Sequence, residues 1–369
     1  MKQQLKQTPE AFEKALATSI TGTRHALKLI SQFVAALVQV RSSNLVKIAN
    51  AIETEAESES VYRQIQRFLK NENELVIDYL KLLKLDGKLK VVLDRTEWKF
   101  GARWVNILCL SVVYKQVAIP LFCEVLNQKG NASAEQHVGI IKRFVARFGR
   151  ERILRLYADR EFGSRELFSY LDEEQIDFHI RLKASHLAAG RSFKRIWRHA
   201  AERVKLKGKI KVTVFGVEVY VSCVKYKKAG KTEYLIVASR ERNKDTIEEY
   251  RVRWRIETMF GCLKSRGFNF EETHLTMPAK IAKLLMLLGL GLCLAMLMGE
   301  LQVEKLKRKK LKLKKNKRYA KSLFRIGLDA LQNALFNRRK KTKEEQLHVF
   351  IDLLSCAYIK DRGFERGII

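Results

Sequence analysis

Residues 248–264, EEYRVRWRIETMFGCLK, decide how the rest of this chain is interpreted. They contain good helix formers, no proline and no glycine before Gly261, so we predict one helix. Steps of three, four and seven residues separate Tyr250, Arg253, Glu257 and Lys264. A helix turns by about 100° per residue, so these side chains lie on one face. A carboxylate among cations is usually a surface ion pair worth roughly 0–1 kcal/mol, so a functional interpretation needs further carboxylates.

Two aspartates supply those carboxylates. Asp94 ends the apolar stretch KLKVVLD and Asp159 ends RILRLYAD, and we expect each at the end of a β-strand. Taken alone, an aspartate in such a place is more often a turn or helix cap. Two aspartates and a glutamate from separate elements, however, are the hard oxygen ligands that two Mg²⁺ ions require. The interpretation therefore depends on all three residues together.

The spacing Tyr250-x2-Arg253-x3-Glu257-x6-Lys264 resembles the YREK signature of the IS4-type DDE transposases, with every residue in register. Asp94-Arg95-Thr96 and Asp159-Arg160-Glu161 each follow an apolar strand, as they do in that family. The resemblance covers roughly residues 88–300. It implies that Asp94, Asp159 and Glu257 are the catalytic residues and hold Mg²⁺ or Mn²⁺, as two ions.

Composition indicates the kind of partner. The 369 residues carry a formal net charge of +32, from 72 Lys and Arg against 40 Asp and Glu. Such an excess repels itself unless a polyanion neutralises it, so nucleic acid is the expected partner and an anionic membrane is the rival. The six cysteines form no CxxC and favour buried free thiols in a reducing compartment. With no signal-peptide core at the N-terminus, we expect a cytoplasmic, nucleoid-associated bacterial protein without a membrane partner.

Residues 1–85 predict an all-helical domain, because apolar positions recur at helical spacing. We expect helices over ALKLISQFVAALVQV, LVKIANAI and VYRQIQRFLKN, the second with its N-cap at Ser42, Ser43 or Asn44. The last two helices form a candidate helix-turn-helix, whose outer face presents Arg63, Gln66, Arg67 and Lys70 to a DNA major groove. A plain helical bundle with a solvated basic face is the alternative.

From Lys88 the pattern changes to strands. KLKVVLD, WVNILCLSVVYKQ and VAIPLFCEVL predict a meander, followed by a helix over residues 135–149. A strand RILRLYAD, a helix SRELFSYLDEE and a strand DFHIRLK complete the order of an RNase H-like α/β core, a mixed sheet flanked by helices, over residues 86–300. Residues 184–240, which include the turn KKAGK, predict a β-rich insertion or the sheet of a second small domain.

Two stretches follow the Glu257 helix. KIAKLLMLLGLGLCLAMLMGEL has an apolar run shorter than the ~20 residues of a membrane span, so we predict a buried helix packed on the sheet. Residues 301–369 predict a basic helical C-terminal region that packs or dimerises. Its block KLKRKKLKLKKNKR, residues 305–318, is expected to be a disordered segment or a phosphate-binding arm.

The resemblance implies a DNA transposase of an insertion sequence, which cleaves element ends and joins them to target DNA by Mg²⁺-dependent phosphoryl transfer. Its expected partners are terminal inverted repeats, target DNA and a second copy of the chain in a synaptic homodimer. The phosphates beside the cut would be held by Tyr250, Arg253, Lys264 and Arg160. Trp197 would hold an expelled base, or else anchors its own helix. The alternatives are another RNase H-like nuclease and a catalytically inactive DNA-binding relative.

Two further carboxylates lie near the predicted ligands. Glu97 is three residues after Asp94, a spacing that points it to the opposite face of a strand. Glu161 follows Asp159 by two residues and is expected near the metal. These two glutamates are the nearest rivals of the three chosen ligands.

Overall fold

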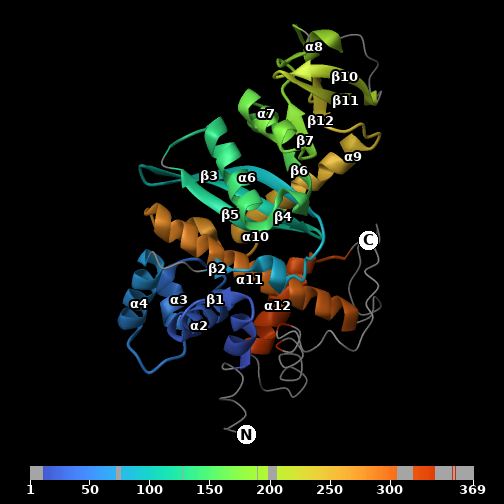
Figure 1. Cartoon of the computed structure of the whole chain (residues 1–369). Coiled ribbons are helices and arrows are strands. Elements are labelled where there is room, and N and C mark those ends of the chain that lie inside the picture. The colour runs from blue at the N-terminus through green and yellow to red at the C-terminus, as the bar shows by residue number, and fades with distance from the viewer. Residues whose placement is uncertain are drawn as a thin grey trace. The chain divides into compact units, whose positions relative to one another are not determined.

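A computed structural model describes residues 11–71, 76–126, 128–188, 190–197, 206–305, 319–336, 351 and 354. The chain divides into two compact units, shown in Figure 1: unit 1 is residues 1–86 with 261–369, and unit 2 is residues 87–260. This division differs from the predicted regions 1–85, 86–300 and 301–369, because the helices after Phe260 join the N-terminal helices. The functional roles assigned to those three regions stay predictions.

Unit 2 is built on an eight-stranded sheet with the order β10-β11-β12-β7-β6-β3-β4-β5. β3 (Leu89–Phe100), β4 (Arg103–Tyr114) and β5 (Val117–Leu126) form an antiparallel meander. β6 (Ile153–Ala158) and β7 (Phe178–Leu182) continue the sheet in parallel on the other side of β3. Three antiparallel strands followed by two parallel ones are the RNase H-like core, so the predicted fold class is confirmed.

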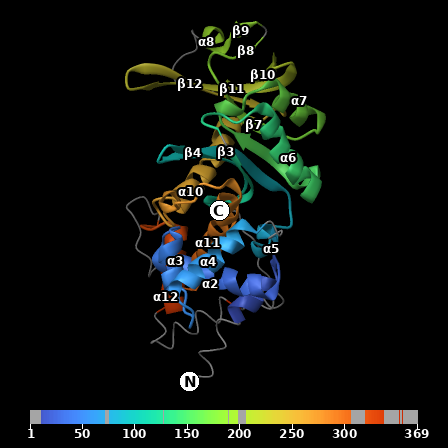
Figure 2. The same cartoon turned by 90° about the vertical axis from the view of Figure 1, so that its left-hand side faces the viewer.

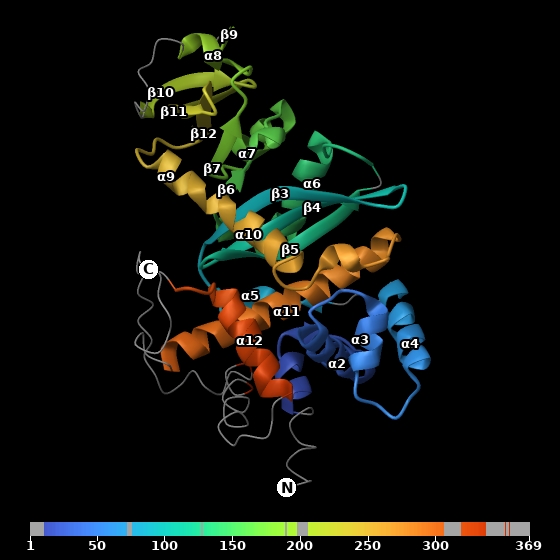
Figure 3. The same ribbon diagram turned by 180° about the vertical axis from the view of Figure 1, so that it is seen from behind.

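Helices cover both faces of this sheet (Figures 1 and 3). α6 (Ala134–Phe148) and α7 (Arg165–Glu173) lie on one face, and α9 (Thr246–Tyr250) and α10 (Trp254–Leu263) lie on the other. α6 begins with a capping box between Ser133 and Gln136, which satisfies two backbone N–H groups that the first turn leaves unpaired. Helices on both faces explain why most residues of the two parallel strands are apolar and buried.

The insertion extends the central sheet and is not the sheet of a separate domain. It contains β8 (Leu187–Ala188), β9 (Arg191–Ser192), α8 (Phe193–Ile196), β10 (Leu206–Val214), β11 (Val217–Lys228) and β12 (Lys231–Ser239). Only the last four residues of β12 pair with β7. Within the described chain, residues 224–228 and 231–235 pair only with each other, and Figure 2 shows them extending as a two-stranded ribbon. We call residues 224–235 the ribbon.

Unit 1 is helical, apart from the short pair of β1 (Ile20–Thr21) and β2 (Val76–Ile77). Residues 11–17 are helical, and they are followed by α2 (Arg24–Val40), α3 (Leu45–Ala51), α4 (Ser58–Lys70), α5 (Tyr79–Leu82), α11 (Pro278–Lys305) and α12 (Leu323–Phe336). Thr23 caps α2, and the side chain of Asn44 accepts hydrogen bonds from two backbone N–H groups of α3. The three predicted N-terminal helices and the N-cap at Asn44 are confirmed.

α11 packs against α12, α2, α4 and α5 within unit 1, so the predicted buried helix is present, and its predicted packing on the sheet stays a prediction. Gly327 of α12 allows a close approach, since a Cβ there would stand 1.7 Å from the carbonyl oxygen of Ala295. We predicted an apolar run too short for a membrane span, but residues 278–304 are long and apolar enough to cross a membrane. Of the 18-residue stretch that meets this criterion, however, 83% is buried within the protein. The basic block lies outside the described residues, apart from Lys305 at the end of α11.

Candidate active site

Asp94 and Asp159 are neighbours at the point where two parallel strands separate. The parallel pairing of β3 with β6 ends at Leu93 and Ala158, and the two aspartates are the next residues of each strand. Asp159 ends its strand as predicted. Asp94 does not, because β3 continues to Phe100 through its pairing with β4. The sheet therefore holds Asp94 from the middle of a strand, which restricts its position more than a strand end would.

The predicted helix over residues 248–264 is broken. α9 ends at Tyr250, a 3₁₀ turn covers Arg251–Arg253, and α10 begins at Trp254. Tyr250 and Arg253 are directed at the two aspartates, and Glu257 follows on the first turns of α10. Lys264 lies one residue beyond α10 in unit 1, where its ammonium is 2.7 Å from Glu271.

Arg253 links the predicted ligands. Its Nη1 donates a hydrogen bond of 2.8 Å to Oδ2 of Asp94, and its Nη2 donates to Oε1 of Glu257. The side chain is only 7% exposed. Although burial lowers the pKa of Arg253, the charges of Asp94, Asp159 and Glu257 help to raise it above its ordinary value. Two of the three predicted ligands therefore contact a single guanidinium, and the charge of the third, Asp159, acts on it.

Asp159 has two other partners. The Tyr250 hydroxyl lies 3.4 Å from Oδ1 of Asp159 and 3.2 Å from the carbonyl oxygen of Ala158. Nη1 of Arg181, on β7, is 3.7 Å from the same carboxylate oxygen. Arg181 was not predicted from the sequence. The one feature that could have indicated it is the presence of an arginine within the otherwise largely apolar strand DFHIRLK.

The two rival glutamates are engaged by Arg95, a second residue that the sequence analysis missed. Its guanidinium contacts Glu97 at 2.8 Å and Glu161 at 3.1 Å. Arg95 and Glu97 are two residues apart on β3 and share a face, opposite to that of Asp94 as predicted for Glu97. Arg95 thus holds β3 to the segment that follows Asp159, and we infer that both glutamates are structural.

Asp94 carries a strongly perturbed carboxyl group. Burial raises its pKa to about 7 against the opposing charge of Arg253, and the charges of Glu161 and Asp159 add to the rise. Among the described residues, the ion pairs of Asp94, Asp159 and Glu257 are with Arg253 and Arg181. Three carboxylates thus face two guanidinium groups, a balance that favours binding of a further cation.

The donor set fits a hard metal ion by its chemistry. Carboxylate oxygens are the ligands that Mg²⁺ and Mn²⁺ prefer, and Asp94, Asp159 and Glu257 are three carboxylates. Among the described residues, however, no three His, Cys, Asp or Glu side chains are grouped so as to hold a metal ion. Arg253 lies between Asp94 and Glu257, so these ligands come together around a metal only if its guanidinium moves.

Asp94 makes the stability of the metal-free protein depend on pH. Its folded pKa of about 7 lies above the ordinary value of 3.8, so its contribution is fully present below about pH 4 and is lost as the pH rises through 7. The difference corresponds to at most about 4 kcal/mol. In EDTA, urea denaturation should show the free energy of unfolding of the wild type falling, relative to Asp94→Asn, between about pH 4 and 8. Parallel pH profiles would contradict a raised pKa.

The predicted base-reading residues lie on α4. Arg63 and Arg67 are exposed, and Arg63 forms a surface ion pair with Glu59. Gln66 is engaged within unit 1, because its amide donates to Tyr62 Oη at 3.0 Å and accepts from Lys280 Nζ at 2.5 Å. The exposed side of α4 therefore offers Arg63 and Arg67 more readily than Gln66, and contact with DNA stays a prediction.

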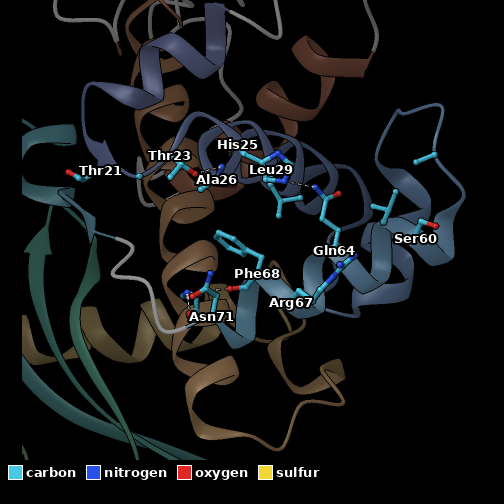
Figure 4. A pocket seen from close by; sticks show the side chains of 14 residues that line it. Thr21, Thr23, His25, Ala26, Leu29, Ser60, Gln64, Arg67, Phe68 and Asn71 are labelled. Atoms are coloured by element: carbon cyan, nitrogen blue, oxygen red, sulfur yellow. Dashed lines mark hydrogen bonds between the residues drawn. The ribbon is translucent and has the colours of Figure 1, made fainter.

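A cavity of about 980 Å³ lies in unit 1 between the start of α2 and α4 (Figure 4). Its lining includes Thr23, His25, Gln64, Arg67 and Phe68, and no carboxylate is among its lining residues. Gln64 Nε2 is 3.0 Å from His25 Nε2, which joins the two helices across the cavity. The cavity thus places Arg67, one of the predicted DNA contacts, at the edge of a recess without negative charge.

Trp197 cannot hold an expelled base in this structure. Its side chain is 4% exposed and stacks on Phe193, with ring centroids 5.1 Å apart and an interplanar angle of 11°. It anchors α8, which was the alternative interpretation. Trp254 is instead 59% exposed, and the guanidinium of Arg253 lies 5.6 Å from its ring. Arg160, also predicted to contact DNA, is exposed immediately after Asp159.

Residues 87–297 match the model of the transposase DDE domain family. No curated protein sequence matches the chain significantly. Among solved structures, the chain is similar to the piggyBac transposase in a synaptic complex with hairpin DNA, with a TM-score of 0.41 and 10% identity. That match covers 85% of this chain and 63% of the piggyBac chain, so this chain spans less than two thirds of its length.

Two endonuclease V structures also match. The enzyme of Ciona intestinalis, bound to inosine-containing DNA, has a TM-score of 0.29 and 9% identity over 47% of this chain and 83% of its own. The Bacillus subtilis enzyme has a TM-score of 0.27 and 11% identity over 62% of this chain and 91% of its own.

Proposed function

This chain belongs to the transposase DDE domain family, and we propose that it is the IS4-type transposase of an insertion sequence. It cleaves DNA at the ends of its element and joins those ends to target DNA. The observation that carries the proposal is that Arg253 contacts Asp94 and Glu257, while Asp159 lies beside Asp94 on the neighbouring strand. Three partly buried carboxylates among arginines fit the cleavage of a polyanion.

The proposed chemistry assigns a role to each residue. Asp94, Asp159 and Glu257 would hold two Mg²⁺ or Mn²⁺ ions, whose chemistry when bound would be activation of the attacking oxygen and charge stabilisation of the leaving one. Tyr250 fixes the orientation of Asp159 through its hydroxyl. Arg253, released from Asp94 and Glu257, holds a phosphate beside the cut, with Arg160 and Lys264 as further phosphate contacts. The chain acts as a homodimer that brings the two inverted repeats together, and no membrane is involved.

The experiment that tests this function uses the DNA on either side of the coding region. Purified protein is incubated with Mg²⁺ and a fragment containing the flanking inverted repeats. Cleavage at the repeats followed by joining to a supercoiled target plasmid supports the proposal. Cleavage without preference for the repeats would support another RNase H-like nuclease, and specific binding without cleavage would support an inactive relative.

The ribbon is a candidate DNA contact. Lys228 and Lys231 are exposed and stand directly opposite each other beside a two-residue turn. Like charges in that position repel, so a polyanion between them would stabilise the ribbon. The base of the ribbon lies beside the candidate active site. β12 continues from the ribbon into its pairing with β7, where Val237 is opposite Arg181, a partner of Asp159.

We therefore expect the double variant Lys228→Gln, Lys231→Gln to bind DNA with a shallower salt dependence. Each lost phosphate contact lowers the slope of log affinity against log salt by about 0.9, so a decrease of up to about 1.8 is expected. Fluorescence anisotropy at several salt concentrations measures the slope. Lys244→Gln, at another exposed lysine of unit 2, is the matched control. Equal slopes for the double variant and the control would exclude the ribbon from the contact.

Trp254 is expected to take the role first predicted for Trp197. Stacking of an unpaired base on an exposed aromatic ring contributes about 1–3 kcal/mol, so Trp254→Ala should weaken binding to ends with an unpaired base by about 5- to 150-fold. Binding to fully paired ends should change little. Trp197→Ala should instead lower the free energy of unfolding by about 3–5 kcal/mol, because it leaves a cavity beneath α8. Equal losses on paired and unpaired ends would contradict a stacking role.

A further inference from the structure

The antiparallel half of the sheet brings two cysteines into contact. Cys109 of β4 stands directly opposite Cys123 of β5, and their Sγ atoms are 2.8 Å apart. A disulfide has an S–S separation of about 2.05 Å, so the two sulfurs need to approach by less than about 1 Å. The strands already hold both side chains on the same face, and no rearrangement of the backbone pairing is needed.

The same pairing places this dithiol beside Asp94. The register of β3 with β4 sets Cys109 opposite Asp94, so Asp94, Cys109 and Cys123 form a row across three neighbouring strands. Burial raises the pKa of the Cys109 thiol well above its ordinary value, and Cys123 and then Asp94 add to the rise. A covalent change at the cysteines is therefore one strand away from a proposed metal ligand.

We propose that Cys109 and Cys123 are a site of reversible oxidation, at which a hydroperoxide or a small-molecule disulfide converts two thiols into a cross-strand disulfide. The other cysteines that the structure describes are buried, and Cys109–Cys123 is the sulfur–sulfur contact found among them. Neither cysteine belongs to a CxxC motif, so the sequence alone did not indicate the pair; the turn between β4 and β5 creates it.

The oxidation begins at Cys123, which is partly exposed, whereas Cys109 is buried. The Cys123 thiolate attacks one oxygen of hydrogen peroxide, the O–O bond breaks, and a sulfenic acid forms with release of hydroxide. The Cys109 sulfur then attacks the Cys123 sulfur, the S–O bond breaks, and the disulfide forms. The hydroxide takes the proton of the Cys123 thiol, and the hydroxyl of the sulfenic acid takes the proton of the Cys109 thiol, so both peroxide oxygens leave as water. A dithiol reverses the reaction by thiol–disulfide exchange.

Disulfide mapping tests the site in the full chain. The protein is treated with hydrogen peroxide, alkylated, digested without reductant and analysed by mass spectrometry. We expect a peptide linking Cys109 to Cys123 that disappears after dithiothreitol. Cys123→Ser should abolish it, and Cys223→Ser, at a buried cysteine of β11, should not. Oxidation of Cys123 to sulfinic acid without a link to Cys109 would overturn the proposal.

A second measurement tests the connection to Asp94, and it rests on the proposed function. Oxidised wild type should cleave DNA at least about threefold more slowly than reduced protein in single turnover, since small misplacements of reacting groups cost on the order of 10²-fold. Dithiothreitol should restore the rate, and peroxide should leave the rate of Cys123→Ser unchanged. A disulfide that forms without altering the rate would overturn the connection. Protein that forms the disulfide but cleaves DNA in neither state would overturn the proposed function instead.

Discussion

Replacing Asp94 or Asp159 by Asn, or Glu257 by Gln, is expected to lower DNA cleavage by more than about 10³-fold, because each amide removes an anionic ligand from the proposed metal site. Binding to the inverted repeats should stay within about threefold of the wild type, since phosphate contacts from basic residues dominate affinity. The amides keep the shape of the side chains. For Asp94 the change also removes a buried carboxyl whose pKa is raised to about 7, so this variant should fold.

Glu161→Gln provides the matched control. Glu161 lies near the site and pairs with Arg95 at 3.1 Å, but we infer a structural role for it. Its cleavage rate should fall less than that of any of the three ligand variants. Single-turnover cleavage at saturating enzyme, alongside anisotropy for binding and circular dichroism for folding, measures these differences. If two of the three ligand variants still cut at the rate of Glu161→Gln, the assignment of the ligands is wrong.

The core of unit 2 could be predicted because its signals are local. KLKVVLD, RILRLYAD and DFHIRLK are short apolar runs between turns, and the structure has a strand within each. The extension of β3 past Asp94 was missed because residues 95–100 are mostly polar. Their strand conformation comes from pairing with β4, a contact that the local pattern does not contain.

Long-range contacts also explain the other errors. An even helical pattern over residues 248–264 concealed the 3₁₀ turn that directs Tyr250 and Arg253 at two different aspartates. α11 is apolar on all sides, so its sequence predicts burial but not its packing partners. Trp197 lies in a basic stretch, so its sequence context suggested a ring available for base stacking. In the structure the ring stacks on Phe193 instead. The candidate catalytic residues could thus be identified from the sequence. The side chains that contact them could not, because those contacts depend on tertiary packing.

Among these tertiary partners, Arg253 is the one whose replacement we expect to have the largest effect on metal binding and cleavage. Its guanidinium contacts Asp94 and Glu257, two of the three ligands that a metal would need. We therefore expect a metal ion and this guanidinium to compete for the same oxygens, so that without DNA the arginine excludes the metal. When a phosphate is bound nearby, it gives Arg253 an alternative anion and leaves the carboxylates to the metal.

Arg253→Met should consequently change metal binding and catalysis in opposite directions. Without DNA, its affinity for Mn²⁺ should rise by at least about tenfold, about 1.4 kcal/mol, because removing a buried cation relieves both competition and repulsion. Cleavage should fall by on the order of 10²-fold, because the scissile phosphate loses a positioning contact. Calorimetric titration with Mn²⁺ and single-turnover cleavage measure the two effects.

Arg155→Met is the matched control for these measurements. Arg155 is a partly buried arginine of unit 2 that bridges two carboxylates, Asp177 and Glu249, neither of which is a proposed ligand. Its loss should destabilise the fold without increasing the affinity for Mn²⁺. If Arg253→Met binds Mn²⁺ no more tightly than the wild type, its guanidinium does not compete with the metal. Normal cleavage by the same variant would make Arg253 a structural partner of Glu257 only.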